Sequence, residues 1–182
     1  MNLEKPHKYE YVVNPAVQTA PVFVIHMVGE SKRVLEIGCG TGIMAEQIAM
    51  RLRSGRLHAI DKSPAQIQKA IMRNQKYIQS GKAVFNTMAL EAMDETERFD
   101  KITAFNVNVF LKPNPPALRL IRQMLKVNGK LFVFYQPPSE KSESLCETIK
   151  YALKAGGFET EKEMIRSMHP ASAVCVTATA DR

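Results

Sequence analysis

An apolar strand passes directly into a glycine-rich turn in the stretch Val34-Leu35-Glu36-Ile37-Gly38-Cys39-Gly40-Thr41-Gly42. Glycines at the end of a strand let the backbone turn sharply and approach a ligand closely, because no Cβ intervenes. Apolar residues then recur four positions apart from Met44 to Leu52, which predicts a helix that ends at Ser54-Gly55. The N-terminus of this helix presents free N–H groups, which favour an anionic ligand group such as a carboxylate or phosphate.

An acidic residue, Asp61, follows the second predicted strand, Arg56–Ile60. It lies about twenty residues beyond the glycine turn, where an acid at a strand end accepts both hydroxyls of a ribose lying across the sheet edge. A tight turn that merely happened to precede a surface aspartate would need two coincidences at this spacing. The turn and the acid together therefore predict a ligand that contains a nucleoside.

The pattern of the turn distinguishes between nucleoside ligands. Nicotinamide dinucleotide sites use GxGxxG, whose third glycine lets the helix and strand pack closely around a pyrophosphate. This chain reads GxGxG and has Ile43 at the position of that third glycine. Glu36, just before the turn, would repel a pyrophosphate but attract an ammonium group. We therefore expect a ligand with an amine, a carboxylate and a ribose, as in an amino acid joined to a nucleoside.

Strands and helices are predicted to alternate as far as Tyr135, which is typical of a parallel sheet covered by helices. Ser63 caps a second helix, with Pro64 at its first position, and this helix is expected to run to Ser80-Gly81. The next predicted elements are strands at Lys82–Thr87, Asp100–Phe105 and Lys130–Tyr135, helices at Ala117–Lys126 and Ser142–Ala155, and at most one helical turn within Ala89–Arg98.

The C-terminal region ends in two strand-like runs, near Phe158–Arg166 and Ser172–Ala180. Because a parallel crossover needs about a dozen residues or more and the link here is short, these strands are expected to pair antiparallel. No composition shift marks a second domain, and 182 residues suit one domain. We predict a single domain over residues 1–182, with an N-terminal arm and lead-in helix in residues 1–30 and a core in residues 31–182.

The composition, 45% hydrophobic and 24% charged, is that of an ordinary globular protein. No apolar run approaches the ~20 residues that cross a bilayer, and Met1–Tyr11 is unlike a secretory leader. Three scattered cysteines without a CxxC pair argue against a disulfide framework or a zinc site and fit a reducing compartment. We expect a cytoplasmic protein with no membrane span and no bound metal.

The formal net charge of +7 suits an anionic partner such as nucleic acid. The basic residues are nevertheless spread along the chain, with no run of five or more. A solvated basic surface is therefore the simpler interpretation, and nucleic acid is a possible but less favoured partner.

The stretch Glu36–Gly42 resembles the first motif of the class I S-adenosylmethionine-dependent methyltransferases, an E/DxGxGxG pattern after an apolar strand. The resemblance covers most of the chain and includes three later landmarks, Phe99-Asp100, Leu125–Gly129 and Gly156-Gly157-Phe158. It implies an α/β fold with a Rossmann-like, doubly wound sheet of seven strands. That sheet is mostly parallel with only the last strand antiparallel, which agrees with the predicted C-terminal pair.

The resemblance also implies S-adenosyl-L-methionine as the cofactor and a role for several residues of this chain. Gly38-Cys39-Gly40 would wrap the methionine part of the cofactor, with Glu36 near its amino group. Asp61 would hold the ribose hydroxyls, and Lys62 would lie along the adenine. Asn106, after the fourth strand, would line the methyl-donor pocket.

The chain departs from the family pattern after the third strand. Many members have an aspartate there that binds the adenine amino group, whereas this chain has Met88. Met88 would pack against the adenine instead, and the backbone N–H of Ala89 would bond a ring nitrogen. The usual Gly-Gly before the fifth strand appears as Asn128-Gly129, which still supports a turn.

We expect an enzyme that transfers the methyl group to a small-molecule acceptor by in-line displacement. Such a reaction mainly needs the nucleophile held at attack distance from the methyl group, so no catalytic residue is obligatory. The net charge favours one alternative, an RNA or other nucleic-acid methyltransferase. The aspartate missing at Met88 favours another, a non-catalytic S-adenosylmethionine-binding domain. A nicotinamide-dependent reductase ranks third.

Other polar residues have structural interpretations. Asn114-Pro115-Pro116-Ala117 is similar to an amino-methyltransferase motif, but it lacks the aromatic residue and is better explained as a helix start. Asn108 would either orient a substrate or cap the next turn, and both interpretations stay open. The best-placed histidines for a general base are His26 and His169, and each is interpreted as structural.

Overall fold

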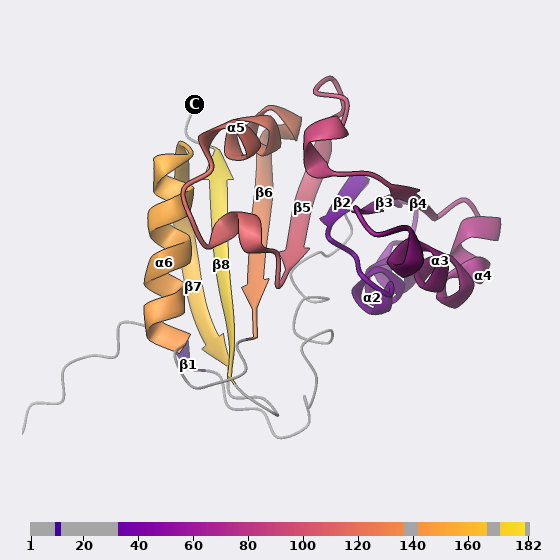
Figure 1. The fold of residues 1–182 in the computed structure, drawn as a ribbon, viewed down its shortest axis with the longest axis horizontal. Coiled ribbons are helices and arrows are strands. Elements are labelled where there is room, and N and C mark those ends of the chain that lie inside the picture. Colours follow the sequence, from indigo (N-terminus) through magenta and orange to yellow (C-terminus); the bar gives the residue numbers. More distant parts are fainter. Residues whose placement is uncertain (1–9, 12–32, 137–141, 167–171, 181–182) are drawn as a thin grey trace, which may run out of the picture.

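The computed structural model describes residues 10–11, 33–136, 142–166 and 172–180, which form one sheet with helices on both faces (Figure 1). The strands are β1 (Glu10–Tyr11), β2 (Arg33–Ile37), β3 (Arg56–Asp61), β4 (Ala83–Thr87), β5 (Phe99–Phe105), β6 (Leu125–Tyr135), β7 (Phe158–Arg166) and β8 (Ala173–Ala180). The helices are α2 (Ile43–Arg51), α3 (Pro64–Arg73), α4 (Gln75–Gln79), α5 (Pro115–Met124) and α6 (Ser142–Ala155), with short 3-10 helices η1 (Leu90–Ala92) and η2 (Asn108–Phe110).

The strands follow the order β1-β7-β8-β6-β5-β2-β3-β4 across the sheet. Neighbouring strands are parallel except β8, which is antiparallel to both β6 and β7. The predicted seven-stranded sheet with an antiparallel last strand is confirmed by β2 to β8. The two-residue β1 adds an eighth strand beside β7, in a segment that the sequence assigned to the N-terminal arm. Two residues are too few to show a strand periodicity.

The order of the strands reverses at β2, which pairs with β3 on one side and β5 on the other. After β2 the chain builds β3 and β4 outward, and it then returns to place β5 and β6 on the opposite side. In open parallel sheets the crevice at such a reversal, beyond the carboxyl ends of the strands, is where ligands bind. Here that crevice lies at Ile37, where β2 enters the glycine turn.

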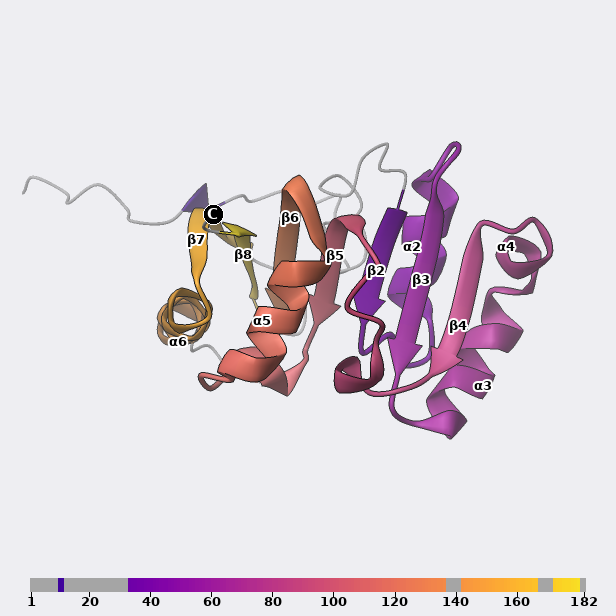
Figure 2. The ribbon, with the colours of Figure 1, turned by 90° about the horizontal axis from the view of Figure 1, so that it is seen from above.

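The sheet separates two hydrophobic cores, one under α2, α3 and α4 and the other under η1, α5 and α6 (Figure 2). Alternate residues of β2 enter different cores, because successive side chains of a strand point to opposite faces. Val34 packs on the α2 side, whereas Leu35 and Ile37 pack on the α5 side. Burial on both faces explains why the central strands are apolar without alternation.

The helix predicted from Ser63 to Ser80 is instead two helices, because Asn74 separates α3 from α4. Its fully buried side chain donates to the backbone carbonyls of Gly42 and Ala70, at 3.0 and 2.9 Å. An asparagine that bonds nearby backbone groups competes with regular helix bonds, so the helix ends here and restarts. The prediction of one continuous helix was wrong at this residue.

The boundary between α5 and β6 also differs from the prediction. The helix ends at Met124 and not at Lys126, because Leu125 already pairs with Phe99 of β5. β6 therefore begins at Leu125, five residues before the predicted Lys130. The other helices and strands predicted within the described residues agree closely with the structure. The lead-in helix predicted in residues 1–30 lies outside the described residues, apart from Glu10–Tyr11.

Candidate functional site

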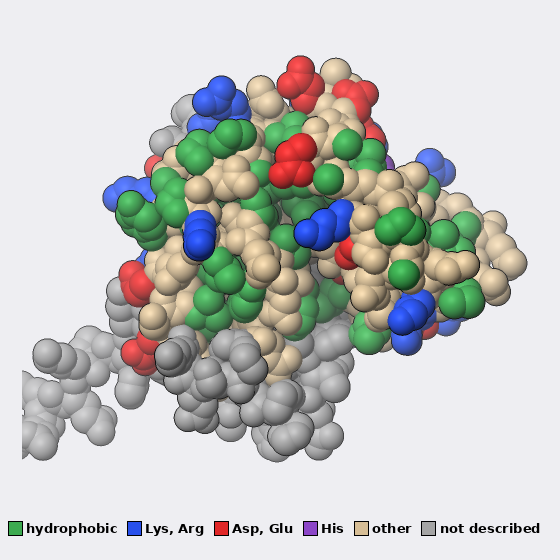
Figure 3. Space-filling view, in the orientation of Figure 1, with side chains coloured by type: hydrophobic (Ala, Val, Ile, Leu, Met, Phe, Trp, Pro, Cys, Tyr) green, Lys and Arg blue, Asp and Glu red, His purple; other side chains and the backbone are tan. Residues whose placement is uncertain are grey.

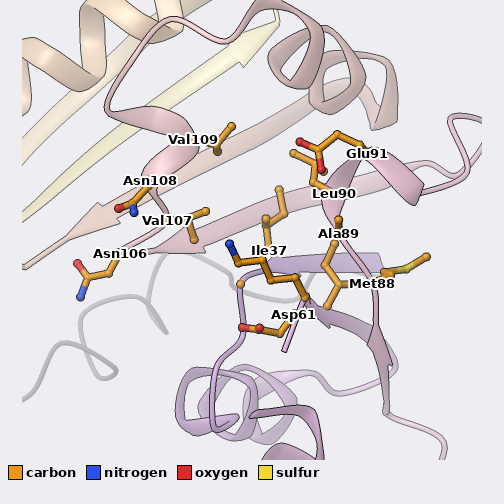
Figure 4. Close-up of a pocket in the computed structure, with 13 residues that line it drawn as sticks. Ile37, Asp61, Met88, Ala89, Leu90, Glu91, Asn106, Val107, Asn108 and Val109 are labelled. Carbon is orange, nitrogen blue, oxygen red and sulfur yellow. The ribbon is translucent and has the colours of Figure 1, made fainter. Parts of the chain in front are cut away.

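A pocket of about 360 Å³ opens at the carboxyl ends of the strands around β2. The space-filling view shows a hollow near the middle of this face (Figure 3). Its volume falls within the range of small-molecule sites, about 300–1,000 Å³. Figure 4 shows the lining residues, which are Ile37, Gly38, Ile60, Asp61, Lys62, Met88, Ala89, Leu90, Glu91, Asn106, Val107, Asn108 and Val109.

The three glycines of the turn have different neighbours. Gly38, Gly40 and Gly42 all adopt positive φ angles, of 69°, 53° and 76°, in the region that favours glycine. A Cβ on Gly38 would lie 2.8 Å from Val107 Cγ2, and one on Gly42 would lie 2.6 Å from Asn74 Nδ2. A Cβ on Gly40 would meet nothing within 4 Å. Protein packing thus requires Gly38 and Gly42, whereas Gly40 borders open space.

Asp61 connects the end of β3 to the glycine turn. Its Oδ2 accepts a hydrogen bond from the backbone N–H of Gly40 at 2.9 Å, and its Oδ1 accepts one from the backbone N–H of Ser63 at 2.9 Å. Each carboxylate oxygen has capacity for a further bond. Asp61 therefore holds the turn in place and, as a residue of the pocket wall, still presents acceptors to a ligand.

Glu36 lies behind the turn, outside the set of residues that line the pocket. Its side chain is 2% exposed, and its Oε2 has no hydrogen-bond partner. Burial raises the pKa of this carboxyl to about 8, and the negative charge of Asp61 adds to the increase. A buried carboxyl oxygen without a partner is costly. A cationic ligand group at the turn would relieve that cost.

The predicted cofactor residues Lys62, Met88 and Ala89 line the pocket beside the ends of β3 and β4. The backbone N–H of Met88 donates to the carbonyl of Asp61 at 3.0 Å, which ties the end of β4 to the end of β3. In Figure 4 the Met88 side chain extends away from Ile37 and Asp61, and it packs against the core on the α5 side. Ala89 follows it at the exposed edge of the pocket.

Asn106 ends β5 with a left-handed backbone, φ 56°, a conformation that asparagine tolerates better than most residues. Its backbone N–H donates to the carbonyl of Phe134 at 2.9 Å, and its Oδ1 accepts from the backbone N–H of Gln136 at 2.9 Å. These bonds join the ends of β5 and β6. The side-chain oxygen of Asn106 is thus used in a hydrogen bond to the backbone, while the residue also forms part of the pocket wall.

Cys39 contributes its backbone to the turn. Its N–H donates to the carbonyl of Ile60 at 3.0 Å, and its side chain, 6% exposed, packs into the core on the α2 side. Burial, with the nearby charges of Glu36 and Asp61, raises the pKa of the thiol far above its ordinary value. The thiol is therefore a small core group and not a nucleophile facing the pocket.

Sequence reasoning missed the apolar wall of the pocket. Ile37 and Ile60 were recognised only as strand residues, and periodicity does not show which residue of a buried strand also borders a ligand space. Leu90 and Glu91 lie in η1, the single helical turn expected within Ala89–Arg98, where no role in a site was predicted. The one available signal was position, because all these residues follow or end a parallel strand. Val107 and Val109 complete the apolar wall.

Asn108 bonds across the pocket rim. Its Oδ1 accepts a hydrogen bond from the Tyr135 hydroxyl at 2.8 Å, and the N-cap of η2 is Val107, which makes no side-chain cap bond. Asn108 is therefore not the cap of that turn. Asn114 does cap α5, accepting from the Ala117 N–H at 3.3 Å, so the interpretation of this stretch as a helix start is confirmed. His26 and His169, which were interpreted as structural, lie outside the described residues.

The described residues contain neither a cluster suited to a metal ion nor a helix suited to crossing a membrane. Its His, Cys, Asp and Glu side chains form no group of three or more that is placed to hold a metal ion. Among the same residues, every helix is too short or too polar to cross a membrane. Cys39, Cys146 and Cys175 are all buried, and no disulfide joins them.

Comparison with solved structures shows the fold. The N-methyltransferase NodS from Bradyrhizobium japonicum WM9, in complex with S-adenosyl-L-homocysteine, superposes with a TM-score of 0.70 at 18% identity. The superposition covers 89% of this chain and 84% of that one. Magnesium protoporphyrin IX methyltransferase from Synechocystis PCC 6803, with bound S-adenosylmethionine, gives a TM-score of 0.63 at 17% identity, over 88% of this chain and 77% of that one.

Sequence comparison shows the family. The uncharacterized methyltransferase YdaC of Bacillus subtilis (strain 168) is 27% identical over 176 residues, which are 92% of this chain and 95% of that protein. Ubiquinone biosynthesis O-methyltransferase of Pseudomonas putida (strain W619) is 32% identical over 104 residues, 56% of this chain and 43% of that enzyme. The methyltransferase domain model matches residues 34–129, more than half of the chain. The chain therefore belongs to the methyltransferase domain family, and the predicted membership of the class I, S-adenosylmethionine-dependent methyltransferases is confirmed.

Proposed function

We propose that this methyltransferase binds S-adenosylmethionine in the pocket at the carboxyl end of β2 and transfers its methyl group to a small-molecule acceptor. The observation that carries the proposal is the arrangement of the glycine turn and Asp61 around one cavity. Gly38 and Asp61 both line it, and Asp61 is bonded to the backbone of Gly40. The turn and the strand-end acid, recognised separately in the sequence, thus belong to a single site.

Two features of the glycine turn fit the cofactor. The open space beside Gly40, where even a Cβ would meet no atom within 4 Å, leaves room for a ligand to contact the backbone. The buried Oε2 of Glu36, behind the turn, has no hydrogen-bond partner, and an ammonium group bound nearby would supply one and favour the ionised carboxylate.

Different residues of this chain would contact different parts of the cofactor. The backbone of Gly38, Cys39 and Gly40 would hold its methionine part, with Glu36 offsetting the positive charge. Asp61 would accept the ribose hydroxyls. Lys62, Met88 and Ala89 would border the adenine, with Leu90 as an apolar wall, and Asn106 would close the methionine end of the pocket.

When bound, the cofactor supplies a methyl group that its sulfonium centre makes electrophilic. The contribution of the chain is to fix the site and to exclude water from it. Fixing two reactants at attack distance lowers a barrier by about 7–11 kcal/mol, so orientation is a sufficient source of catalysis. Asn108, held at the rim by Tyr135, is the polar residue best placed to orient an acceptor.

A small-molecule acceptor is favoured by two observations. The ubiquinone biosynthesis enzyme that shares 32% identity over 104 residues acts, by its name, in the synthesis of a small molecule. Among the described residues on the face that contains the pocket, Lys and Arg side chains stand apart from one another and form no continuous basic stripe of the kind that tracks a nucleic-acid backbone (Figure 3). We also propose a cytoplasmic location, in keeping with three cysteines that no disulfide joins.

Isothermal titration with S-adenosylmethionine and S-adenosylhomocysteine tests the cofactor assignment. Binding with one site per chain is expected, and no heat at millimolar ligand would reject it. The acceptor is then tested by measuring S-adenosylhomocysteine release with a panel of phenols, amines and carboxylates, and separately with RNA. Release with a small molecule supports the proposal. Release with RNA alone, at a rate that falls steeply with salt, would establish the nucleic-acid alternative.

The same experiments distinguish the non-catalytic alternative. A cofactor-binding domain without activity would bind both ligands and release product with no member of either panel. Competition with a nicotinamide dinucleotide, at concentrations that saturate such reductases, is expected to leave S-adenosylhomocysteine binding unchanged. Displacement by the dinucleotide would favour the reductase interpretation.

A further inference from the structure

The junction between α3 and α4 contacts the glycine turn through Arg73 and Asn74, which do not line the pocket. Asn74, at this junction, is fully buried, and its Nδ2 donates to the Gly42 carbonyl at 3.0 Å. The same nitrogen donates to the Ala70 carbonyl in α3 at 2.9 Å. The side chain of Asn74, 32 residues beyond Gly42 in the sequence, therefore joins the last glycine of the turn to α3.

The packing around Gly42 makes this contact close. A Cβ on Gly42 would lie 2.6 Å from Asn74 Nδ2 and 2.8 Å from Ala70 Cβ, so only glycine allows α3 to approach the turn to this distance. The Gly42 carbonyl also accepts the N–H of Glu46, the first bond of α2. The position of that carbonyl therefore determines both the end of the turn and the start of the helix.

A second residue of the junction contacts the same turn. Arg73, the last residue of α3, donates from Nε to the Thr41 carbonyl at 3.2 Å. Its guanidinium also lies 3.7 Å from Glu46 Oε2 in α2. Two consecutive carbonyls of the turn, those of Thr41 and Gly42, thus accept hydrogen bonds from two consecutive residues, Arg73 and Asn74.

We infer that Asn74 and Arg73 are positioning residues that set the conformation of the glycine turn and, through it, the affinity for the cofactor. The inference rests on the proposed cofactor site. Asp61 bonds the Gly40 N–H from the pocket side, while Arg73 and Asn74 bond the following carbonyls from the helix side. The turn, whose three glycines give it wide conformational freedom, is held in one conformation by bonds from both directions.

This role explains an otherwise costly arrangement. Asn74 leaves its own Oδ1 buried without a partner and divides a helix that an apolar residue would have continued. A buried polar atom without a partner destabilises the fold. The two hydrogen bonds to Gly42 and Ala70 offset that cost, and the bond to Gly42 fixes the conformation of the turn.

The first test substitutes Arg73, because its side chain is exposed and removing it leaves the hydrophobic core intact. In Arg73→Ala the affinity for S-adenosylhomocysteine, measured by isothermal titration, is expected to fall about threefold, as for one lost hydrogen bond. Lys69→Ala, which removes another exposed cation of α3, is the matched control and is expected to bind like the wild type. Equal affinity of the two variants would contradict the role of Arg73.

The second test uses Asn74→Ala, with Tyr77→Leu as the matched control. Tyr77 is a buried residue of α4 in the same core, so its truncation also weakens the packing of this region but leaves the amide of Asn74 in place. At a temperature where both variants are folded, Asn74→Ala is expected to weaken binding about tenfold. Tyr77→Leu is expected to lower the melting temperature without changing the affinity.

Amide hydrogen exchange of the peptide spanning residues 38–46, measured without ligand, decides the inference independently of cofactor binding. Faster exchange in Arg73→Ala and Asn74→Ala than in their controls supports it, and exchange rates equal to those of the controls would overturn it. If Asn74→Ala does not fold, Arg73→Ala decides. If the wild-type protein binds no S-adenosylhomocysteine, the proposed function fails, while the exchange rates still report on the turn.

Discussion

The backbone N–H of Gly40 donates a hydrogen bond to Oδ2 of Asp61 at 2.9 Å. This bond joins the middle glycine of the first βα turn to the end of the next strand, across 21 residues of sequence. The residue that would bind a ribose therefore also holds the loop that would bind the amino acid part of the same ligand. Any change at Asp61 is expected to affect both halves of the site.

Asp61→Ala is expected to weaken S-adenosylhomocysteine binding at least about tenfold and to lower stability by about 1–3 kcal/mol. The variant removes the acceptor for the ribose hydroxyls and also the acceptor for the N–H groups of Gly40 and Ser63. Isothermal titration and chemical denaturation measure the two effects. Asp94→Ala, which removes an exposed acid bonded to Thr96, is the control for charge. Wild-type affinity in Asp61→Ala would show that the ribose assignment is wrong.

Alanine substitutions at Gly40 and Gly42 are expected to separate binding from stability. Both positions have positive φ, so each substitution costs about 1–2 kcal/mol of backbone strain. Gly42→Ala should lose more, because its Cβ would overlap Ala70 and Asn74, whereas the Cβ of Gly40→Ala occupies only open space. Thermal denaturation should therefore rank Gly42→Ala as the less stable variant. Titration should find that Gly40→Ala, although folded, binds the cofactor weakly. If Gly40→Ala binds as tightly as the wild type, the ligand does not occupy the space beside Gly40.

The buried carboxyl of Glu36 should make folding stability depend on pH. Its pKa is about 8 in the folded chain, above the ordinary 4.5, so between these values the folded state binds more protons than the unfolded state. The stabilising contribution of this carboxyl to the free energy of unfolding is therefore complete below about pH 4.5. It decreases as the pH rises toward 8, by up to about 1.4 kcal/mol per pH unit. Denaturation at several pH values should show this slope in the wild type.

Glu36→Gln should remove the slope, because glutamine stays neutral while keeping the size of the side chain. The variant is expected to be more stable than the wild type at pH 8 to 9 and yet to bind S-adenosylhomocysteine more weakly, since the negative group for the ammonium is lost. Glu159→Gln, which neutralises an exposed acid of β7 outside the pocket lining, is the control. If Glu36→Gln and the wild type keep a constant difference in stability across this pH range, the carboxyl does not titrate as described.

The hydrogen bond from Tyr135 to Asn108 should be measurable as a coupling energy. Tyr135→Phe removes the hydroxyl, Asn108→Ala removes its acceptor, and the double variant loses nothing further from this contact. A double-mutant cycle on the free energy of unfolding is expected to give about 1 kcal/mol. Strictly additive effects would mean that the two side chains do not hold each other at the rim.

Local sequence patterns were sufficient for most of the fold. The alternation of apolar runs with capped helices predicted the sheet, and the short link before the last strand predicted its antiparallel pairing with β7. These features depend on neighbouring residues, such as Ser63 bonding the N–H of Gln66 in the first turn of α3. The turn glycines and Asp61 were recognisable for the same reason, since each ends a strand at a characteristic spacing.

Other properties of the site depend on contacts between distant segments, which no local pattern contains. The division of a regular-looking helix at Asn74 follows from a bond to Gly42, 32 residues away. The partner of Asn108 lies on another strand, 27 residues away, and the apolar wall joins residues from four separate strand ends. The raised pKa of Glu36 likewise arises from burial and from the charge of Asp61, because desolvation and Coulomb interactions depend on distance in space and not along the chain. Periodicity and turn chemistry therefore predicted the scaffold and its glycine turn, whereas packing alone determined how that turn is held and how the pKa of its neighbouring acid is raised.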